Sequence, residues 1–88
     1  MRITTWNVNG FRAVLKKEFK GSIEKIAPDI LCLQEIKAKD DQLTPEEKEI
    51  TGYTRYWNSA DQPGYSGVAT YIKNSLLDTI NEFGFNFL

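Results

Sequence analysis

Histidine is absent from the sequence, and cysteine occurs once, as Cys32. A single cysteine cannot form a disulfide within the chain, and a reducing compartment is its simplest context, so we expect a cytoplasmic protein. No apolar run approaches the roughly 18 residues of a membrane-spanning helix. The N-terminus also lacks the apolar core of a signal peptide. The formal net charge of −1 gives no overall signal for binding nucleic acid.

The composition is that of a globular protein, with 41% apolar and 26% charged residues in a chain of 88 residues. This length allows one domain at most. It lies near the size at which folding buries only about 60 to 65% of the unfolded surface. Any fold of the isolated chain therefore has little stability to spare.

The prediction of the fold starts from the apolar run 29–35. This run follows Pro28 and ends on two polar residues, Gln34 and Glu35. An unbroken apolar run of this length predicts a strand buried on both faces. Glu35 then lies at the end of the strand. From this position alone, its carboxylate either caps a structural network or holds a cation.

Two elements precede this strand. The segment 2–7 contains β-branched and aromatic residues, which predicts a first strand that stops at the turn-forming residues 7–10. Apolar spacings of three and four over 11–27 predict one or two short helices, separated by Gly21, with Ser22 as an N-cap. A strand, helix, strand unit makes neighbouring parallel strands, so Asn7 and Glu35 are expected at the same edge of the sheet.

The remaining segments continue an α/β pattern. After a polar loop over 37–42, Thr44 is expected to cap a short helix that ends near Gly52, with Glu47 completing a capping box. Strands are predicted over 53–57 and 67–72 around a hairpin loop at 58–64, and a weaker strand over 76–82. The sequence thus predicts about five strands and two to three short helices.

Three blocks of sequence, Trp6 to Ala13, Asp29 to Lys37 and Gly64 to Ala69, stand in the order and approximate spacing of the exonuclease III family of apurinic/apyrimidinic endonucleases. The chain resembles this family over essentially its whole length. The wider superfamily, which includes deoxyribonuclease I, sphingomyelinases and inositol phosphatases, shares the asparagine and the Gln-Glu pair at the two strand ends. The Gly-Phe-Arg-Ala and Gly-Tyr-Ser-Gly-Val-Ala segments resemble the DNA-repair branch.

The resemblance implies a four-layer α/β sandwich with two central sheets, like that of deoxyribonuclease I. Residues 1–88 would be the N-terminal part, about a third, of a single endonuclease/exonuclease/phosphatase domain. We therefore expect a sequence cut after Leu88. The family's catalytic histidine, active-site tyrosine, Asp-x-Asn segment and Ser-Asp-His block would belong to the other two thirds.

The resemblance also implies a metal-binding and catalytic role for Glu35, with magnesium or manganese as the ion, because hard cations take one or two carboxylates plus water and phosphate oxygens. Asn7 would be the catalytic asparagine that positions the reacting groups. From residue types alone, however, the segment 7–10 is more often just a simple turn.

Four further residues resemble positions that contact substrate: Asn9, Arg12, Lys37 and Tyr65. Arg12 would bind a phosphate and Tyr65 would touch the DNA backbone from its loop. A solvated helix charge and a half-buried hairpin aromatic are the alternatives for these two. Lys37 either orients Glu35 or approaches phosphate.

The implied activity is metal-dependent hydrolysis of double-stranded DNA at abasic sites and 3′ ends, carried out by a protein longer than this chain. The 88 residues alone hold no imidazole base, so we expect them to be inactive. Two alternatives are a non-catalytic fragment that self-associates through an open sheet edge and a superfamily phosphatase acting on small or lipid phosphoesters.

Overall fold

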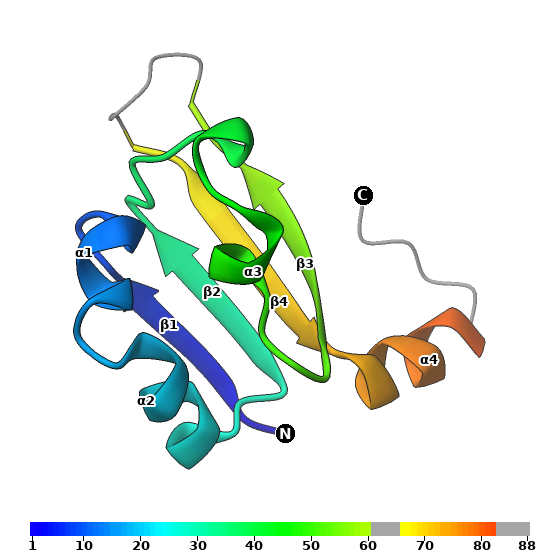
Figure 1. Cartoon of the computed structure of the whole chain (residues 1–88). Helices are drawn as coiled ribbons and strands as arrows, with labels where there is room; N and C mark the ends of the chain where they lie inside the picture. Colours follow the sequence, from blue (N-terminus) through cyan, green and yellow to red (C-terminus); the bar gives the residue numbers. More distant parts are fainter. Residues whose placement is uncertain (61–65, 83–88) are drawn as a thin grey trace.

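A computed structural model describes residues 1–60 and 66–82, in which a four-stranded mixed sheet has α1, α2 and α3 on one side (Figure 1). The strands lie in the order β1, β2, β4, β3. They span Ile3–Asn7 (β1), Ile30–Gln34 (β2), Tyr53–Asn58 (β3) and Val68–Lys73 (β4). The α-helices span Phe11–Leu15 (α1), Phe19–Ile26 (α2), Pro45–Lys48 (α3) and Asn74–Glu82 (α4), and a 3₁₀ turn, η1, spans Asp40–Gln42.

The parallel pairing of the first two strands is confirmed. Ile3 of β1 lies beside Ile30 of β2, and Asn7 lies beside Gln34. The chain returns between them through α1 and α2 (Figure 1). Since both strands run in the same direction, their carboxyl ends meet at one edge of the sheet.

The helical break predicted at Gly21 is wrong, because Gly21 lies inside α2. The break falls before Phe19, where Glu18 adopts a left-handed backbone with φ of 58°. Phe19 and Ile23 are four residues apart, so they lie on the same face of the helix, and both are fully buried. Their burial in the core keeps the intervening turn, which contains Gly21, helical. Ser22 is accordingly not an N-cap, whereas α2 does end before Pro28, at Ile26 with Ala27 as its C-cap.

The core lies between the helices and one face of the sheet. Leu31 and Leu33 of β2 are fully buried there, and Phe11 makes edge-to-face contacts with Phe19 and Trp57. Burial of β2 on both faces was predicted, but Ile30 and Cys32 on its other face are only half-buried. The reason is that α1, α2 and α3 all cover the same face.

The capping box of α3 is confirmed. Thr44 Oγ1 accepts a hydrogen bond from the Glu47 backbone N–H at 3.1 Å, and Glu47 Oε1 accepts one from the Thr44 N–H at 2.8 Å. The helix ends at Lys48, earlier than the predicted end near Gly52.

The predicted fifth strand over 76–82 is wrong, because this segment forms α4. Leu76, Leu77 and Ile80 are the half-buried residues of α4. They share one face at helical spacing, whereas a strand would have placed Leu76 and Leu77 on opposite faces. The described part of the chain therefore has four strands and four α-helices. No helix within it is long and apolar enough to cross a membrane.

Candidate functional site

Asn7 and Glu35 meet where β1 and β2 end. The Asn7 side-chain amide Nδ2 donates a hydrogen bond to Glu35 Oε2. Its Oδ1 accepts one from the Asn9 backbone N–H at 3.0 Å. Both ends of the amide are therefore engaged, so the turn after β1 fixes the side chain that holds the carboxylate.

Lys37 joins this pair to Asn9. Its Nζ donates to Asn9 Oδ1 at 2.5 Å and lies 3.9 Å from Glu35 Oε1. Four of the residues singled out in the sequence thus form a ring of polar contacts, closed through the Asn9 backbone N–H and the Lys37–Glu35 ion pair: Asn7, Glu35, Lys37 and Asn9. We call this the strand-end ring.

The backbone beneath the strand-end ring is held in an unusual conformation. Glu35, Lys37 and Asn9 all have left-handed backbones, with φ of 52°, 54° and 46°. Such conformations are costly for residues other than glycine and persist only where the surroundings fix them. Here the carbonyls of Glu35 and Ile36 accept the backbone N–H groups of Gly10 and of Phe11, the first residue of α1, each at 2.8 Å.

Ile36 anchors the segment that carries Glu35 and Lys37. It is fully buried between these two partly exposed residues, and its N–H donates to the Gly67 carbonyl at 3.2 Å. Neither Ile36 nor Gly67 is a residue type that points to a functional site. The available signal was one large apolar residue between two charged ones directly after a strand.

Lys48, which residue patterns also do not mark as important, holds in place the segment around Asp40 that follows the strand-end ring in the chain. It is buried at 5% exposure, and its Nζ donates to the Asp40 carbonyl at 2.8 Å and to Asp40 Oδ1 at 2.6 Å. Because a lysine is almost never buried without a partner, this pairing explains its position. Sequence alone shows Lys48 as one charge in a charged helix.

Glu35 is suited to hold a metal ion as one carboxylate ligand. Its side chain is 44% exposed, and its Oε1 faces Lys37 at 3.9 Å, beyond hydrogen-bonding distance. No group of three or more His, Cys, Asp or Glu side chains gathers in the described ranges. The donor set here therefore fits a hard cation that takes few carboxylates and fills its remaining positions with water or substrate oxygens.

The predicted DNA-contacting residues have different outcomes. Arg12 is exposed on α1, close in sequence to Asn9 and Gly10, and makes no hydrogen bond or ion pair with any described residue. Its role in binding phosphate stays a prediction. Tyr65 lies outside the described residues.

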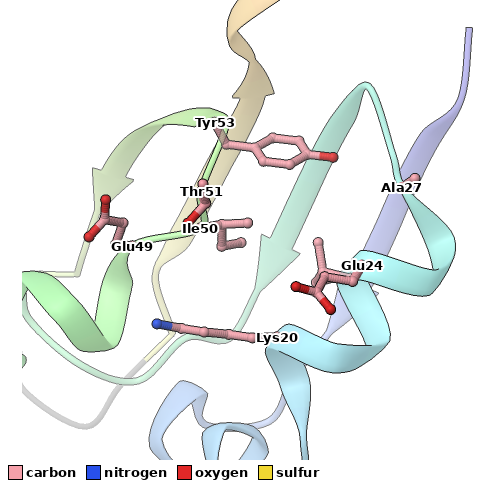
Figure 2. A pocket seen from close by; sticks show the side chains of 8 residues that line it. Lys20, Glu24, Ala27, Glu49, Ile50, Thr51 and Tyr53 are labelled. Atoms are coloured by element: carbon pink, nitrogen blue, oxygen red, sulfur yellow. The ribbon is translucent and has the colours of Figure 1, made fainter.

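A cavity of about 310 Å³ lies elsewhere, between α2 and the segment that joins α3 to β3 (Figure 2). Ile23 and Ile50 contribute apolar side chains to it, and Glu24 and Glu49 are among its charged lining residues. It is also lined by Ala27 and Tyr53, which lie at the end of the sheet opposite to Asn7 and Glu35. The cavity is therefore separate from the strand-end ring.

Comparisons with known proteins agree with this geometry. A profile of the Endonuclease/Exonuclease/phosphatase family matches residues 4–88. The chain is 42% identical over 87 residues to the exodeoxyribonuclease of Bacillus subtilis, which covers 96% of this chain and 32% of that protein. It is 42% identical over 86 residues to the DNA repair nuclease APEX1 of Danio rerio, covering 96% and 28%.

Among solved structures, the catalytic domain of Xenopus laevis APE2 matches with a TM-score of 0.72 and 41% identity, covering 85% of this chain and 24% of that one. This likeness confirms the expected α/β fold class. The chain spans about a third or less of the length of each of these three proteins.

Proposed function

Because the chain belongs to the endonuclease/exonuclease/phosphatase family, we propose that it contributes to a DNA repair nuclease of the exodeoxyribonuclease III type. The similar proteins are an exodeoxyribonuclease and a DNA repair nuclease. The proposed reaction is metal-dependent hydrolysis of the phosphodiester backbone of double-stranded DNA at abasic sites and at 3′ ends.

The observation that carries this proposal is the strand-end ring. It places one accessible carboxylate, held by an amide, beside an ammonium group at the carboxyl ends of two parallel strands. A purely structural ion pair at the surface would contribute little to stability. It would not require three left-handed residues in the segments beneath it.

Glu35 would hold magnesium, or manganese in its place. When bound, such an ion neutralises charge on the phosphate oxygens. Asn7 keeps one carboxylate oxygen of Glu35 in position by donating a hydrogen bond to it. Lys37, anchored by Asn9, holds a positive charge beside the same carboxylate, where a phosphate oxygen could pair with it.

Arg12 and Tyr65 would contact the DNA backbone, and phosphate contacts of this kind position the substrate. Selectivity for abasic sites would come from acceptance of an extruded sugar. Extrusion is easier where the missing base removes stacking and pairing.

The isolated 88-residue chain should lack this activity. Hydrolysis needs an activated water and a stabilised leaving oxygen besides the metal. The chain has no histidine, and its described part offers one carboxylate at the ring. Incision of abasic DNA by the purified 88-residue chain, abolished by Glu35→Ala, would refute this expectation.

The proposal is tested with this sequence inside a protein of the length of its relatives. Duplex DNA with one abasic site is incubated with magnesium or with chelator, and the incision rate is measured. Glu35→Gln removes the carboxylate charge at constant size, and we expect a loss of about a hundredfold or more. The control Glu24→Gln, an exposed position on α2, should retain the parent rate.

Two results would count against the proposal. One is unchanged incision by the Glu35→Gln variant. The other is hydrolysis of small or lipid phosphoesters without incision of DNA, which would support the superfamily phosphatase instead. The cytoplasmic location, inferred from the single cysteine, stays a prediction, as does self-association through the edge strands β1 and β3.

A further inference from the structure

Two side chains bridge the elements on either side of the cavity between α2 and the segment that joins α3 to β3. The hydroxyl of Tyr53, on β3, donates to the carbonyl of Pro28, which follows α2. The Nζ of Lys20, on α2, donates to the carbonyl of Glu46, on α3, at 2.5 Å. Figure 2 shows these two side chains on opposite sides of Ile50. Because both bridges exist without a ligand, the cavity is largely preformed.

The floor of the cavity is apolar and its rim is charged. Ile23 and Ile50 are only 1% and 8% exposed, whereas Glu24 and Glu49 are exposed. Pockets for small molecules combine an apolar lining with a few polar groups that fix the orientation of the ligand. The volume of about 310 Å³ lies at the lower end of the range for such pockets, so the cavity suits a small molecule.

The charges around the cavity favour a cation. The ammonium group of Lys20 is engaged by the Glu46 carbonyl. The carboxylates of Glu24 and Glu49 make no hydrogen bond or ion pair with any described residue, and in Figure 2 the Glu24 side chain extends from α2 toward Ile50. Two carboxylates around one ammonium leave a local negative charge, which attracts cations and repels anions.

We propose that this cavity binds a small primary amine with a short alkyl chain. The alkyl chain packs on Ile23 and Ile50, where it is removed from water. The ammonium group stays at the rim beside Glu24 and Glu49, where it remains hydrated and avoids the cost of burying a charge.

This orientation separates a free amine from a lysine side chain of a partner protein. The charge of a lysine is at the tip of the side chain, so it would enter first and reach the apolar floor, where burial of a charge is unfavourable. The inference is independent of the proposed nuclease function, because the cavity lies at the end of the sheet opposite to the strand-end ring.

The test is an NMR titration of the 88-residue chain, with isotope-labelled isoleucine methyl groups, by pentylamine. We expect saturable shifts of the Ile23 and Ile50 methyl groups, while Ile36 beside the strand-end ring stays unchanged. A ligand of about six non-hydrogen atoms reaches only modest affinity, so the expected Kd is in the millimolar range.

Three matched probes test the charge and the orientation of the ligand. Pentanol, which lacks the charge, should bind about threefold more weakly than pentylamine, because an exposed ion pair contributes little. Pentanoate should bind at least about tenfold more weakly, since the carboxylates repel it. Cadaverine, the same chain with an ammonium group at both ends, should also bind about tenfold more weakly, because one charge would reach the floor.

The double variant Glu24→Gln/Glu49→Gln removes both charges at constant size and at exposed positions, so it should fold. It should lower the affinity for pentylamine about threefold and leave that for pentanol unchanged. The control Glu82→Gln, an exposed position on α4, should bind both probes like the parent.

Four results would overturn the proposal. The first is the absence of saturable shifts at Ile23 and Ile50 up to about 100 mM pentylamine. The second is equal affinity for pentylamine and pentanol, and the third is cadaverine binding as tightly as pentylamine. The fourth is a shift that is largest at Ile36, which would place the amine at the carboxylate of Glu35 instead.

Discussion

At the scale of single residues, the side chain of Asn7 connects the end of β1 to Glu35, which follows the end of β2. Its amide donates to Glu35 and accepts from the Asn9 N–H. A carboxylate at position 7 could accept the second bond but could not donate the first. Residues 7–10 do form a turn, in which the bond from the Asn9 N–H to Asn7 is local, while the catalytic role of Asn7 stays a prediction. The same side chain shapes the turn and holds the carboxylate.

Gly67 is the residue whose replacement should disturb the ring most directly. A Cβ there would lie 2.9 Å from Ile36 Cγ1 and 3.3 Å from the Ser59 Cα, on a backbone with φ of +91°. We expect Gly67→Ala to lower the free energy of unfolding by about 2 to 4 kcal/mol, combining backbone strain with overpacking. Urea titration measures the loss.

Gly52 is the matched control, because it has a similar φ of +88° but open space around a Cβ. Gly52→Ala should cost only the backbone strain, about 1 to 2 kcal/mol. Equal losses for the two variants would show that Ile36 yields freely, so the packing between Ile36 and Gly67 would not hold the ring.

At the scale of elements, the short helix α3 depends on its first residue. Four residues cannot sustain a helix by themselves, and Thr44 supplies the cap on which α3 relies. We expect Thr44→Ala to cost about 1 kcal/mol of unfolding free energy, whereas Thr51→Ala at an exposed turn should be nearly neutral. Chemical denaturation compares the two variants, and a loss of equal size in both would contradict a specific capping role.

The elements also show which features the sequence could predict. The parallel pairing of β1 and β2, and therefore the meeting of Asn7 with Glu35, followed from chain order and hydrophobic pattern. The helical break was misplaced because turn propensity at Gly21 is weaker than the tertiary burial of Phe19 and Ile23. A strand is the wrong prediction for the segment of α4, because Leu76, Leu77 and Ile80 have helical spacing.

Other features depend on contacts between distant segments, which no local pattern contains. The left-handed backbones of Glu35 and Lys37 are stabilised by partners from the turn after β1 and from Ser66. The closure of the ring through Lys37 and Asn9 depends on these backbones. The half-exposed outer face of β2 likewise reflects which face the helices happen to cover.

At the scale of the whole molecule, Asp29 connects residues from three segments of the chain at the end of the sheet opposite to the strand-end ring. Its carboxylate accepts the Arg2 N–H at 2.6 Å and lies 3.7 Å from Lys73 Nζ. The Arg2 N–H, assisted by Lys73, lowers the pKa of Asp29. The folded state thus holds this group ionised more readily than the unfolded state, so its stabilisation is present above about pH 4 and is lost as the pH falls further.

We therefore expect Asp29→Asn to flatten the acid side of the stability profile, measured by urea unfolding from about pH 2 to 7. The variant should be less stable than the parent at neutral pH, and the difference should shrink toward low pH. A difference that stays constant across this range would show that the ionised form of Asp29 has no special role.

Tyr71 affects the stability of the fold at the alkaline end of the pH range. It is fully buried, and its hydroxyl donates to the Lys48 carbonyl at 2.5 Å. Burial raises the pKa of the Tyr71 phenol, against a smaller opposing effect of Arg55. The unfolded chain releases this proton near pH 10 while the folded chain keeps it. Its stabilisation is therefore complete below about pH 10 and is lost as the pH rises further.

Tyr71→Phe should then cost about 1 kcal/mol at neutral pH, for the lost hydrogen bond, and should reduce the fall in stability above pH 10. Part of the fall should remain, because burial also raises the pKa of Tyr53. Asp29→Asn is compared with it: this variant lowers stability at neutral pH as well, but the pH dependence that it removes lies mainly on the acid side, since Asp29 is only the second cause of the raised pKa of Tyr53. If Tyr71→Phe showed the same alkaline slope as the parent, deprotonation of Tyr71 would not be what unfolds the chain at high pH.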